Sequence, residues 1–392
     1  MVIPRTTTIA MALVLASTSG CILLYEEVGG GGQGGSSNGG AGGTVSAGGQ
    51  ASGGDDNGGG GSNVGGSGGD GGEGGGGTCV PPVQVNVVNM MCPGSAVAVE
   101  GSSIFVVRGA GCPDSPAASA TIGHYTGLVA PEFVNAAQVP LATGLGLAAR
   151  DADNVFYAPQ GGEILDIGDG ESISAQCPGC NAYWGGIVAV GGAYYISVQN
   201  KANGAVYEFD ALGTFIPKSD PDTTDELGYE VDAIRHTATE TSLAWTTLTG
   251  DLATGTIHRS STIFGYASGT ATLGPPSGIA LDEDGTIYVR VAAGSSAELS
   301  KLYKWVPDSE EPDPYPVEIV APLRSLVALD RKRQILYANG FVSGQAGPQT
   351  VYRCACDDCS PAPVACDTIS DIAVDDETGV AVFTCGNQLV TW

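Results

Sequence analysis

The sequence predicts an all-β fold, a seven-bladed β-propeller closed by an N-terminal strand that completes the last blade. The first observation is a phrase that recurs seven times: a short apolar run around an alanine, a turn of Asp, Gly or Glu, and a second apolar or aromatic run. The copies follow one another at intervals of 41 to 50 residues, the repeat length of propeller blades. The second observation is that the last copy lacks one strand, whereas a strand-like run is left over before the first copy.

The seven copies each have an alanine in the first apolar run and lie within residues 79–392. These alanines are Ala98, Ala148, Ala189, Ala233, Ala280, Ala328 and Ala373. Helical repeats have a similar length, but they need apolar residues at a period of 3.6, which the copies lack. The second runs are rich in β-branched and aromatic residues bounded by turns, which is typical of strands.

The fifth copy shows how one blade is expected to be built. We expect the innermost strand at Ser277–Leu281, a hairpin turn at 282–285 and the second strand at Thr286–Val291. The third and outer strands are expected at 298–306 and 317–320.

This copy also carries a family resemblance. Its phrase PSGIALDEDGTIYVRV, at 276–291, resembles the repeat of NHL and gluconolactonase-like propellers. The other six copies share only the apolar–turn–apolar rhythm. The resemblance implies a propeller fold. In gluconolactonase-like enzymes it also implies carboxylate or amide ligands that hold a divalent metal in the central channel.

The ends of the array predict how the ring closes. The last copy, residues 371–392, contains three strand-like runs and lacks a fourth, whereas a strand-like run at 83–88 precedes the first copy. We expect the early run to complete the last blade, because an open array would leave an unpaired strand edge. The alternative is an unpaired N-terminal strand beside an open array.

The N-terminus predicts export. Residues 1–20 carry Arg5, an apolar run at 9–16 and then small residues directly before Cys21, as in a signal peptide. The small residues and cysteine resemble the bacterial lipobox, although Thr18 stands where the family usually has Leu. The resemblance implies an acylated Cys21 and a lipoprotein of the cell envelope, anchored at the outer membrane. An ordinary cleavable signal with a leftover cysteine is the alternative.

Residues 21–78 are expected to be the anchor cysteine and a disordered tether. Between Gly29 and Gly77, 28 of 49 residues are glycine, which is too little apolar surface for a core. The formal net charge of the chain is −27, so nucleic acids and anionic lipid surfaces are disfavoured as partners. We therefore expect a monomer that touches the membrane only through its anchor.

The chain has 11 cysteines, and ten remain for disulfides if Cys21 is acylated. The sixth copy is expected to have its third strand at 351–356, a turn at 357–361 and its outer strand at 363–367. That hairpin predicts the first two of the following pairs; the third is a local pair, and the fourth follows from positions beside the last blade. The predicted disulfides are Cys354–Cys366, Cys356–Cys359, Cys177–Cys180 and, as the favoured pairing among the rest, Cys92–Cys385. Zinc at the Cys354 cluster and redox use of Cys177–Cys180 are the alternatives.

Candidate ligand residues are those at the start of each inner strand, where a propeller channel opens. The carboxylates there are Glu230, Asp232 and Asp371, and the hydroxyls are Ser95, Ser277, Ser325 and Ser370. Three carboxylates on two blades fall short of the metal-ligand set that the resemblance implies. We expect no catalytic residue and no cofactor; calcium is the cation that the acidic turns at 151–154 and 220–226 would take, if they are more than solvated turns.

The three histidines, His124, His236 and His258, fall in different copies and are expected to be isolated surface or turn residues. The leading hypothesis is a non-enzymatic lipoprotein that binds a protein, glycan or envelope component. A wet aromatic patch of Tyr183–Trp184 and Tyr194–Tyr195 would favour it, although core packing is expected for at least two of these rings. The alternatives are a metal-dependent, lactonase-like hydrolase at the channel and a purely structural envelope protein.

Overall fold

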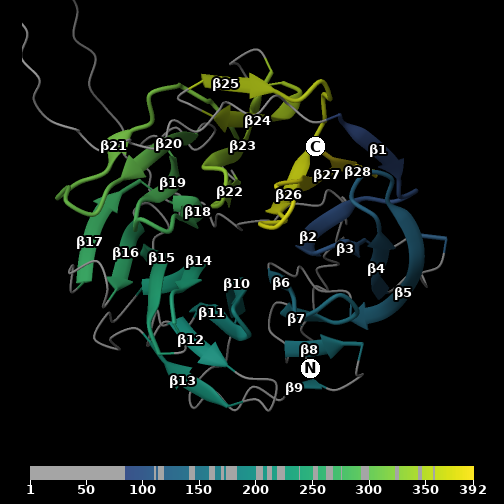
Figure 1. The fold of residues 1–392 in the computed structure, drawn as a ribbon, viewed down its shortest axis with the longest axis horizontal. Helices are drawn as coiled ribbons and strands as arrows, with labels where there is room; N and C mark the ends of the chain where they lie inside the picture. Colours follow the sequence, from purple (N-terminus) through teal and green to yellow (C-terminus); the bar gives the residue numbers. More distant parts are fainter. Residues whose placement is uncertain are drawn as a thin grey trace, which may run out of the picture. The chain divides into compact units, whose positions relative to one another are not determined.

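The chain folds into seven four-stranded antiparallel sheets arranged as blades around a central axis, which confirms the predicted propeller (Figure 1). The computed structural model describes the residues in the following ranges. They are 84–109, 112–113, 119–140, 146–158, 164–168, 172–173, 183–199, 206–209, 214–218, 226–237, 239–249, 255–261, 268–274, 276–292, 300–322, 326–342, 347–355 and 358–392. The expected signal peptide, Cys21 and the tether lie outside them. No helix in these ranges is long and apolar enough to cross a membrane.

Six blades are continuous in sequence, and each runs from an inner to an outer strand. Blade 1 has β2 (Gly94–Glu100), β3 (Ser103–Arg108), β4 (Ser119–Thr126) and β5 (Glu132–Pro140). Blade 2 has β6 (Gly146–Ala149), β7 (Val155–Ala158), β8 (Ile164–Ile167) and β9 (Ser172–Ile173). Blade 3 has β10 (Tyr183–Val190), β11 (Ala193–Gln199), β12 (Val206–Phe209) and β13 (Phe215–Pro217).

Blade 4 has β14 (Glu226–Arg235), β15 (Thr241–Thr249), β16 (Gly255–Ser261) and β17 (Ser268–Leu273). Blade 5 has β18 (Pro276–Leu281), β19 (Ile287–Ala292), β20 (Ser300–Trp305) and β21 (Asp313–Pro314). Blade 6 has β22 (Val327–Asp330), β23 (Ile335–Phe341), β24 (Gln349–Ala355) and β25 (Asp358–Pro361). Blade 7 has β26 (Ile369–Val374), β27 (Ala381–Cys385), β28 (Gln388–Thr391) and, as its outer strand, β1 (Asn86–Asn89).

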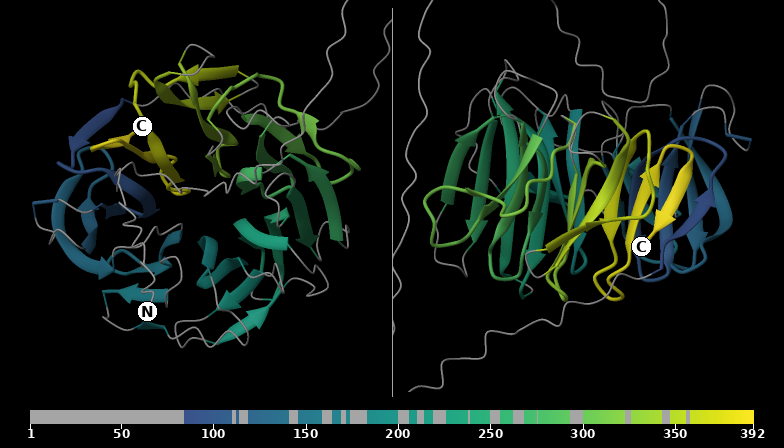
Figure 2. Two further views of the ribbon diagram at one scale, coloured as in Figure 1. Left: turned by 180° about the vertical axis from the view of Figure 1, so that it is seen from behind. Right: turned by 90° about the horizontal axis from the view of Figure 1, so that it is seen from above.

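The core is divided among the seams between blades. Each pair of neighbouring blades encloses one apolar cluster, because a blade is apolar on both faces. Between blades 2 and 3, for example, Phe156 packs edge-on against Tyr194 and Phe209, with ring centroids 4.5 and 5.4 Å apart. Seen from the side, the sheets stand next to one another around the axis (Figure 2). Because the seams between blades are apolar, polar side chains of the inner strands lie toward the central channel.

The ring closes as the sequence predicts. β1 pairs antiparallel with β28, from Asn86 opposite Thr391 to Asn89 opposite Gln388. The chain thereby places a strand from before blade 1 in blade 7, and the two described ends of the propeller lie side by side (Figure 1). This pairing removes the open edge of β28.

In blade 5 the first three strands are as predicted and the outermost strand is not. The turn after β18 is closed by a hydrogen bond from the Gly285 amide to the Asp282 carbonyl at 2.9 Å, and Gly285 has φ +85°. The outer strand predicted at 317–320 is wrong, because the outer strand is Asp313–Pro314. Ile319 is instead a buried residue in the seam with blade 6.

The outer hairpin of blade 6 also differs from the prediction. Ala355 pairs with Asp358, so the chain reverses earlier than expected and the residues assigned to a turn form β25. β25 ends at Pro361, which has no backbone N–H. This is tolerated because β25 is the outer edge strand and no further strand needs that donor. The predicted outer strand at 363–367 is wrong; in that segment, Cys366 forms an isolated bridge with Gln349.

This register changes the disulfides of blade 6. Cys354 lies directly opposite Cys359 on β24 and β25, and these two residues form a disulfide with their Cα atoms 4.0 Å apart. The predicted pairs Cys354–Cys366 and Cys356–Cys359 are therefore both wrong. They assumed a hairpin centred near Ser360, three residues later than the observed reversal.

Two further disulfides among the described residues lie next to blade 7. Cys366, in the segment from blade 6 to blade 7, is bonded to Cys385 on β27. Cys92, directly after β1, is bonded to Cys112 of blade 1. The predicted pair Cys92–Cys385 is therefore wrong, because each of its cysteines is bonded to another cysteine. The predicted pair Cys177–Cys180 lies outside the described residues.

The disulfides should differ in their effect on stability. In the loop-entropy account, the bonds that close 19 and 20 residues each stabilise the fold by about 3 kcal/mol, and the bond that closes 5 residues by about 2 kcal/mol. We expect C366S/C385S to lower the free energy of unfolding more than C354S/C359S. Urea unfolding of the oxidised variants measures this, and peptide mapping without reduction checks the pairing. Equal losses, or a Cys354–Cys366 peptide, would contradict it.

Candidate functional site

The inner strands of the seven blades surround a cavity of about 250 Å³ on the axis. Its wall includes Val97, Leu147 and Gly186 from blades 1 to 3, and Ile279 and Val327 from blades 5 and 6. The polar groups in the wall come mainly from blades 4, 6 and 7. This cavity is smaller than most sites for drug-sized ligands, which are roughly 300–1,000 Å³.

A β-bulge lies near the start of the inner strand in blades 1, 3, 4, 5 and 7. Each bulge adds one residue to the inner strand relative to the second strand, and bulges often re-aim a side chain at the rim of a barrel or beside a site. The candidate residues gather at this place. Ser95, Glu230, Ser277, Ser370 and Asp371 all lie within the bulges, whereas Ser325 lies outside the described residues.

The bulges are held from the second strand of the same blade. In blade 4 the Thr246 hydroxyl accepts the Glu230 amide at 3.1 Å. In blade 7 the Thr384 hydroxyl accepts the amides of Ser370 and Asp371 at 3.3 and 3.2 Å. In blade 6 the Asn339 side-chain oxygen accepts the Leu326 amide at 2.8 Å, directly before β22. The sequence analysis missed these side chains, although a buried polar residue at the end of an apolar second strand was the available signal.

Asp371 connects blade 7 to blade 1. Its carboxylate accepts the Val97 amide of β2 at 2.8 Å and the Ile372 amide at 2.9 Å. Both hydrogen bonds are made to backbone amides of inner strands. The carboxylate thus joins the first and last blades at the axis, on the inner side of the seam that β1 closes on the outside.

Asp232 connects blade 4 to blade 5 in a similar way. Its carboxylate accepts the Leu281 amide of β18 at 2.7 Å and the Ala233 amide at 2.8 Å. The side chain is only 11% exposed. Asp232 is therefore committed to the contact between inner strands, as is Asp371.

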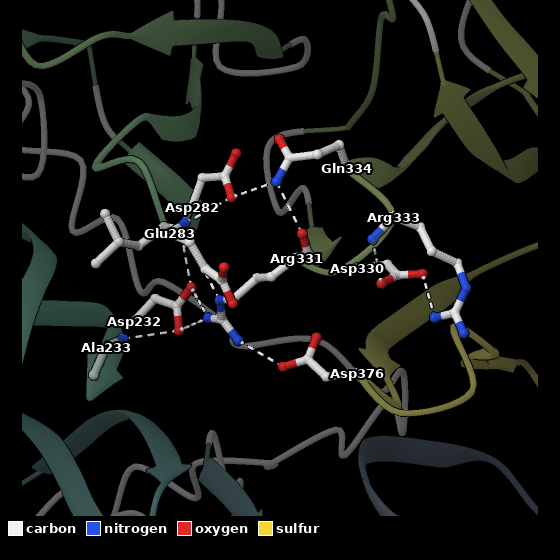
Figure 3. Close-up of polar contacts among 10 residues, drawn as sticks. Asp232, Ala233, Asp282, Glu283, Asp330, Arg331, Arg333, Gln334 and Asp376 are labelled. Carbon is white, nitrogen blue, oxygen red and sulfur yellow. Dashed lines mark hydrogen bonds and ion pairs between the residues drawn. The ribbon is translucent and has the colours of Figure 1, made fainter. Parts of the chain in front are cut away.

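Arg331 occupies the end of the channel where inner strands turn into second strands (Figure 3). It leaves the turn after β22, and its Nη2 donates to both carboxylate oxygens of Asp232 at 2.7 Å. Its Nη1 donates to Asp376 of blade 7 at 3.1 Å, and its Nε to the Leu281 carbonyl at 2.9 Å. One guanidinium therefore connects blade 6 to blades 4, 5 and 7.

Burial and ion pairing shift the pKa values of Arg331 and of the carboxylates near it. Burial by itself would lower the pKa of Arg331, but Asp232 and Asp376 raise it above its usual range. Burial raises the pKa of Asp376, and the nearby Arg331 only partly offsets this. Burial likewise raises the pKa of Asp282, whose carboxylate accepts the Gln334 amide at 2.8 Å. Arg331 is thus a permanent cation at this end of the channel.

The sequence analysis missed Arg331. The signal was present, because the turn of the sixth copy reads Arg-Lys-Arg at 331–333, whereas the same positions in the second, fifth and seventh copies read Asp-Ala-Asp, Glu-Asp-Gly and Asp-Glu-Thr. A positive turn among acidic turns of a ring predicts ion pairs across that ring. The partner in blade 4 is 99 residues away, so sequence spacing alone could not identify it.

Glu230 lies in the channel wall beside blade 3. A Cβ atom on Gly186 would come within 2.7 Å of its carboxylate oxygen, so glycine is required there for Glu230 to keep its place. Glu230 and Asp371 stand at equivalent positions, each directly before the residue where pairing resumes after the bulge. They are, however, three blades apart around the ring. Among the described residues, no group of three or more His, Cys, Asp and Glu is placed to hold a metal ion.

The histidines are more buried than predicted. His124 and His258 lie within β4 and β16 and are 9% and 6% exposed, so the prediction of surface or turn positions is wrong for both. Each histidine bonds a hydroxyl through Nε2. The pairs are His124 with Ser103 at 3.2 Å, His236 with Ser242 at 2.9 Å and His258 with Thr247 at 2.9 Å.

Two other expectations are resolved in part. The Asp151 carboxylate accepts the amides of Asp153 and Asn154 at 2.9 Å, so this acidic turn is organised by its own hydrogen bonds. The second acidic turn lies almost wholly outside the described residues. Tyr194 and Tyr195 are buried in seams, so they belong to no exposed aromatic patch.

The seven sheets, the axial cavity and the closing strand define a seven-bladed β-propeller. No family model and no curated protein matches the sequence. Among solved structures, a streptogramin B lyase is similar at 10% identity over 79% of this chain and 96% of the lyase, with a TM-score of 0.50. A gluconolactonase from Xanthomonas campestris is similar at 15% identity over 63% of this chain and 84% of that one, with a TM-score of 0.42. At these identities the likeness concerns the fold alone.

The two carboxylates that contact Arg331 should respond differently to neutralisation. In Asp232→Asn an amide NH₂ must face a backbone N–H or the guanidinium, and we expect a loss of about 3 kcal/mol in the free energy of unfolding. Asp376→Asn keeps an oxygen acceptor and should cost less than about 1 kcal/mol, since its side chain is 43% exposed.

The raised pKa of Asp376 also predicts that its neutralisation costs little stability. A raised folded-state pKa means that this group stabilises the fold when protonated, below its unfolded pKa, and loses that contribution as pH rises. Neutralising it at pH 7 therefore removes an unfavourable charge along with the ion pair. Urea unfolding of the matched variants is the measurement, and equal destabilisation would contradict this account.

Proposed function

We propose that this protein is a non-enzymatic binding module of the cell envelope, whose propeller presents a rigid surface to a protein, glycan or envelope component. The observation that carries the proposal is the state of the channel carboxylates. Asp232 and Asp371 are engaged by backbone amides of neighbouring blades, and Asp232 and Asp376 face the guanidinium of Arg331.

This arrangement is unfavourable for a hydrolytic metal centre. Hard divalent cations need six or more oxygen ligands, usually including several carboxylates with free lone pairs. In the channel, most of that capacity is used in holding inner strands together. A divalent ion near Asp232 would also be repelled by Arg331, which is a fixed positive charge in a partly desolvated place.

The proposed location rests on the cysteines. Disulfides form and persist in oxidising compartments, and three occur among the described residues. They agree with export through the signal at residues 1–20. We propose that acylated Cys21 anchors the chain and that the glycine-rich segment up to residue 78 separates the propeller from the membrane.

One observation favours the alternative of a metal-dependent, lactonase-like hydrolase. Glu230 and Asp371 lie at equivalent bulges and both line the axial cavity. A metal held there would use these two carboxylates and recruit further ligands from the channel. The two functions therefore differ in one measurable property, the metal content of the protein.

Metal analysis of the purified full-length protein tests the proposal. After exposure to Ca²⁺, Mg²⁺ or Zn²⁺ and dialysis, we expect far less than one metal ion per chain, and hydrolysis of simple γ- and δ-lactones at the rate of buffer alone. Retention of one ion per chain that is lost in Glu230→Gln, together with lactone hydrolysis, would refute the binding-module proposal in favour of the hydrolase.

Anchoring is tested separately at Cys21. Cys21→Ser should move the protein from the membrane fraction to the soluble fraction and leave a longer, unprocessed chain, because no thioether can form. Fractionation and intact-mass measurement report both effects, and Cys79→Ser is the matched control that should stay in the membrane fraction. Wild-type protein that is wholly soluble after export would contradict the anchor.

A further inference from the structure

A cavity of about 600 Å³, larger than the one on the axis, lies between blades 1 and 2. On the blade 1 side it is lined by Ile122, His124 and Asn135, and on the blade 2 side by Leu165 and Ile167. Its volume is within the range of small-molecule sites, which are roughly 300–1,000 Å³. The sequence analysis did not consider this place.

The described strands on the two sides of the cavity differ in length. The third and outer strands of blade 1 have 8 and 9 residues, whereas those of blade 2 have 4 and 2. On the blade 2 side, Leu165 and Ile167 pack against the apolar cluster of the two blades and are only partly buried.

His124 is one of the polar residues in the wall, together with Asn135, Gln138, Asp153 and Asp166. It is 9% exposed, it stacks on Phe105 with ring centroids 4.8 Å apart and planes 17° from parallel, and its Nε2 bonds the Ser103 hydroxyl at 3.2 Å. Its Nδ1 has no hydrogen-bond partner in the described part of the chain. Burial lowers the pKa of His124, against a smaller opposing effect of Asp153, so the ring is neutral at pH 7.

Asn135 is a second polar residue of the wall. It lies directly opposite His124 in the pairing of β4 with β5, and opposed residues point to the same face of a sheet. Asn135 is exposed, so its amide is accessible to a ligand as both donor and acceptor. At the rim, Asp153 adds a carboxylate on a turn fixed by the Asp151 side chain.

We propose that this cavity binds a neutral saccharide, with His124 and Asn135 bonding its hydroxyl groups. A sugar ring has an apolar face of C–H groups that matches Ile122, Leu165 and Ile167, and hydroxyls that need mixed donors and acceptors. The carboxylate of Asp153 and the net charge of −27 disfavour an anionic ligand. This inference rests on the proposed binding role and assigns it a ligand class and a site away from the channel.

Titration of the oxidised full-length protein with neutral sugars tests it. The probes are glucose, galactose, mannose and N-acetylglucosamine, with glucuronate as the anionic comparison, and saturation-transfer NMR reports binding. We expect at least one neutral sugar to bind and glucuronate not to. Because the chain has three histidines, their ring signals can be resolved, and the sugar should shift the His124 signal alone.

Asn135→Ala should weaken binding of that sugar about tenfold, the value of one lost hydrogen bond to a ligand hydroxyl. Val134→Ala is the matched control, because Val134 is exposed on the same strand and does not line the cavity. Both positions are exposed, so neither variant should affect folding.

The outcomes separate this inference from the proposed function. If no sugar binds, or if binding is undiminished in Asn135→Ala and leaves the His124 signal unmoved, the saccharide site is refuted while the binding-module proposal stands. If the protein instead retains a metal ion and hydrolyses lactones, the proposed function fails, and with it the basis of this inference.

Discussion

Backbone pairing between β1 and β28 is the interaction on which the ring depends. Without it blade 7 would have three strands and an open edge, and the seam with blade 1 would lose part of its apolar cover. Two disulfides lie on either side of this blade, Cys366–Cys385 where the chain enters it and Cys92–Cys112 where the closing strand leaves it. Asp371 joins the same two blades at the axis. The Cys92–Cys112 bond and the Asp371 carboxylate therefore reinforce the contact between blades 7 and 1, and the Cys366–Cys385 bond reinforces the seam between blades 6 and 7.

Polar groups near the axis serve a similar purpose. Inner strands of neighbouring blades diverge, so some of their amides find no partner in an adjacent strand. Asp232 and Asp371 accept hydrogen bonds from such amides, and the positive charge of Arg331 offsets part of the negative charge of the carboxylates near the axis. Because a buried amide without a partner costs roughly 1–3 kcal/mol, these side chains are better understood as parts of the ring than as spare ligands.

The sequence was sufficient for the fold because propeller blades repeat a local pattern. The alternation of apolar runs and turns identified all seven inner hairpins, and the surplus strand at one end matched the deficit at the other. Outer strands were less predictable. They are short and exposed and need no strong pattern, which is why blade 5 ends in Asp313–Pro314 and blade 6 in a strand with a terminal proline.

The candidate site was predictable only in its position. Counting back from the alanines identified Glu230, which lines the axial cavity, whereas Ser95 and Ser277 lie in bulges and are not among the residues that line it. What those residues contact could not be deduced, since the partners lie on other blades. Arg331 and Asp232 are 99 residues apart, and the cavity beside His124 is lined by residues of two blades. Such relations depend on how blades are placed around the ring.

The disulfide between Cys92 and Cys112 also determines how the propeller responds to mechanical force. Tension applied through the chain that precedes β1 acts along the length of that strand, so its four residue pairs with β28 are loaded together in shear. Should the strand slip, the pull reaches Cys92 three residues later and passes through a covalent bond into blade 1. A body held by its N-terminal segment in a flowing or crowded medium would therefore be pulled as a whole, and its blades would not be drawn out one after another.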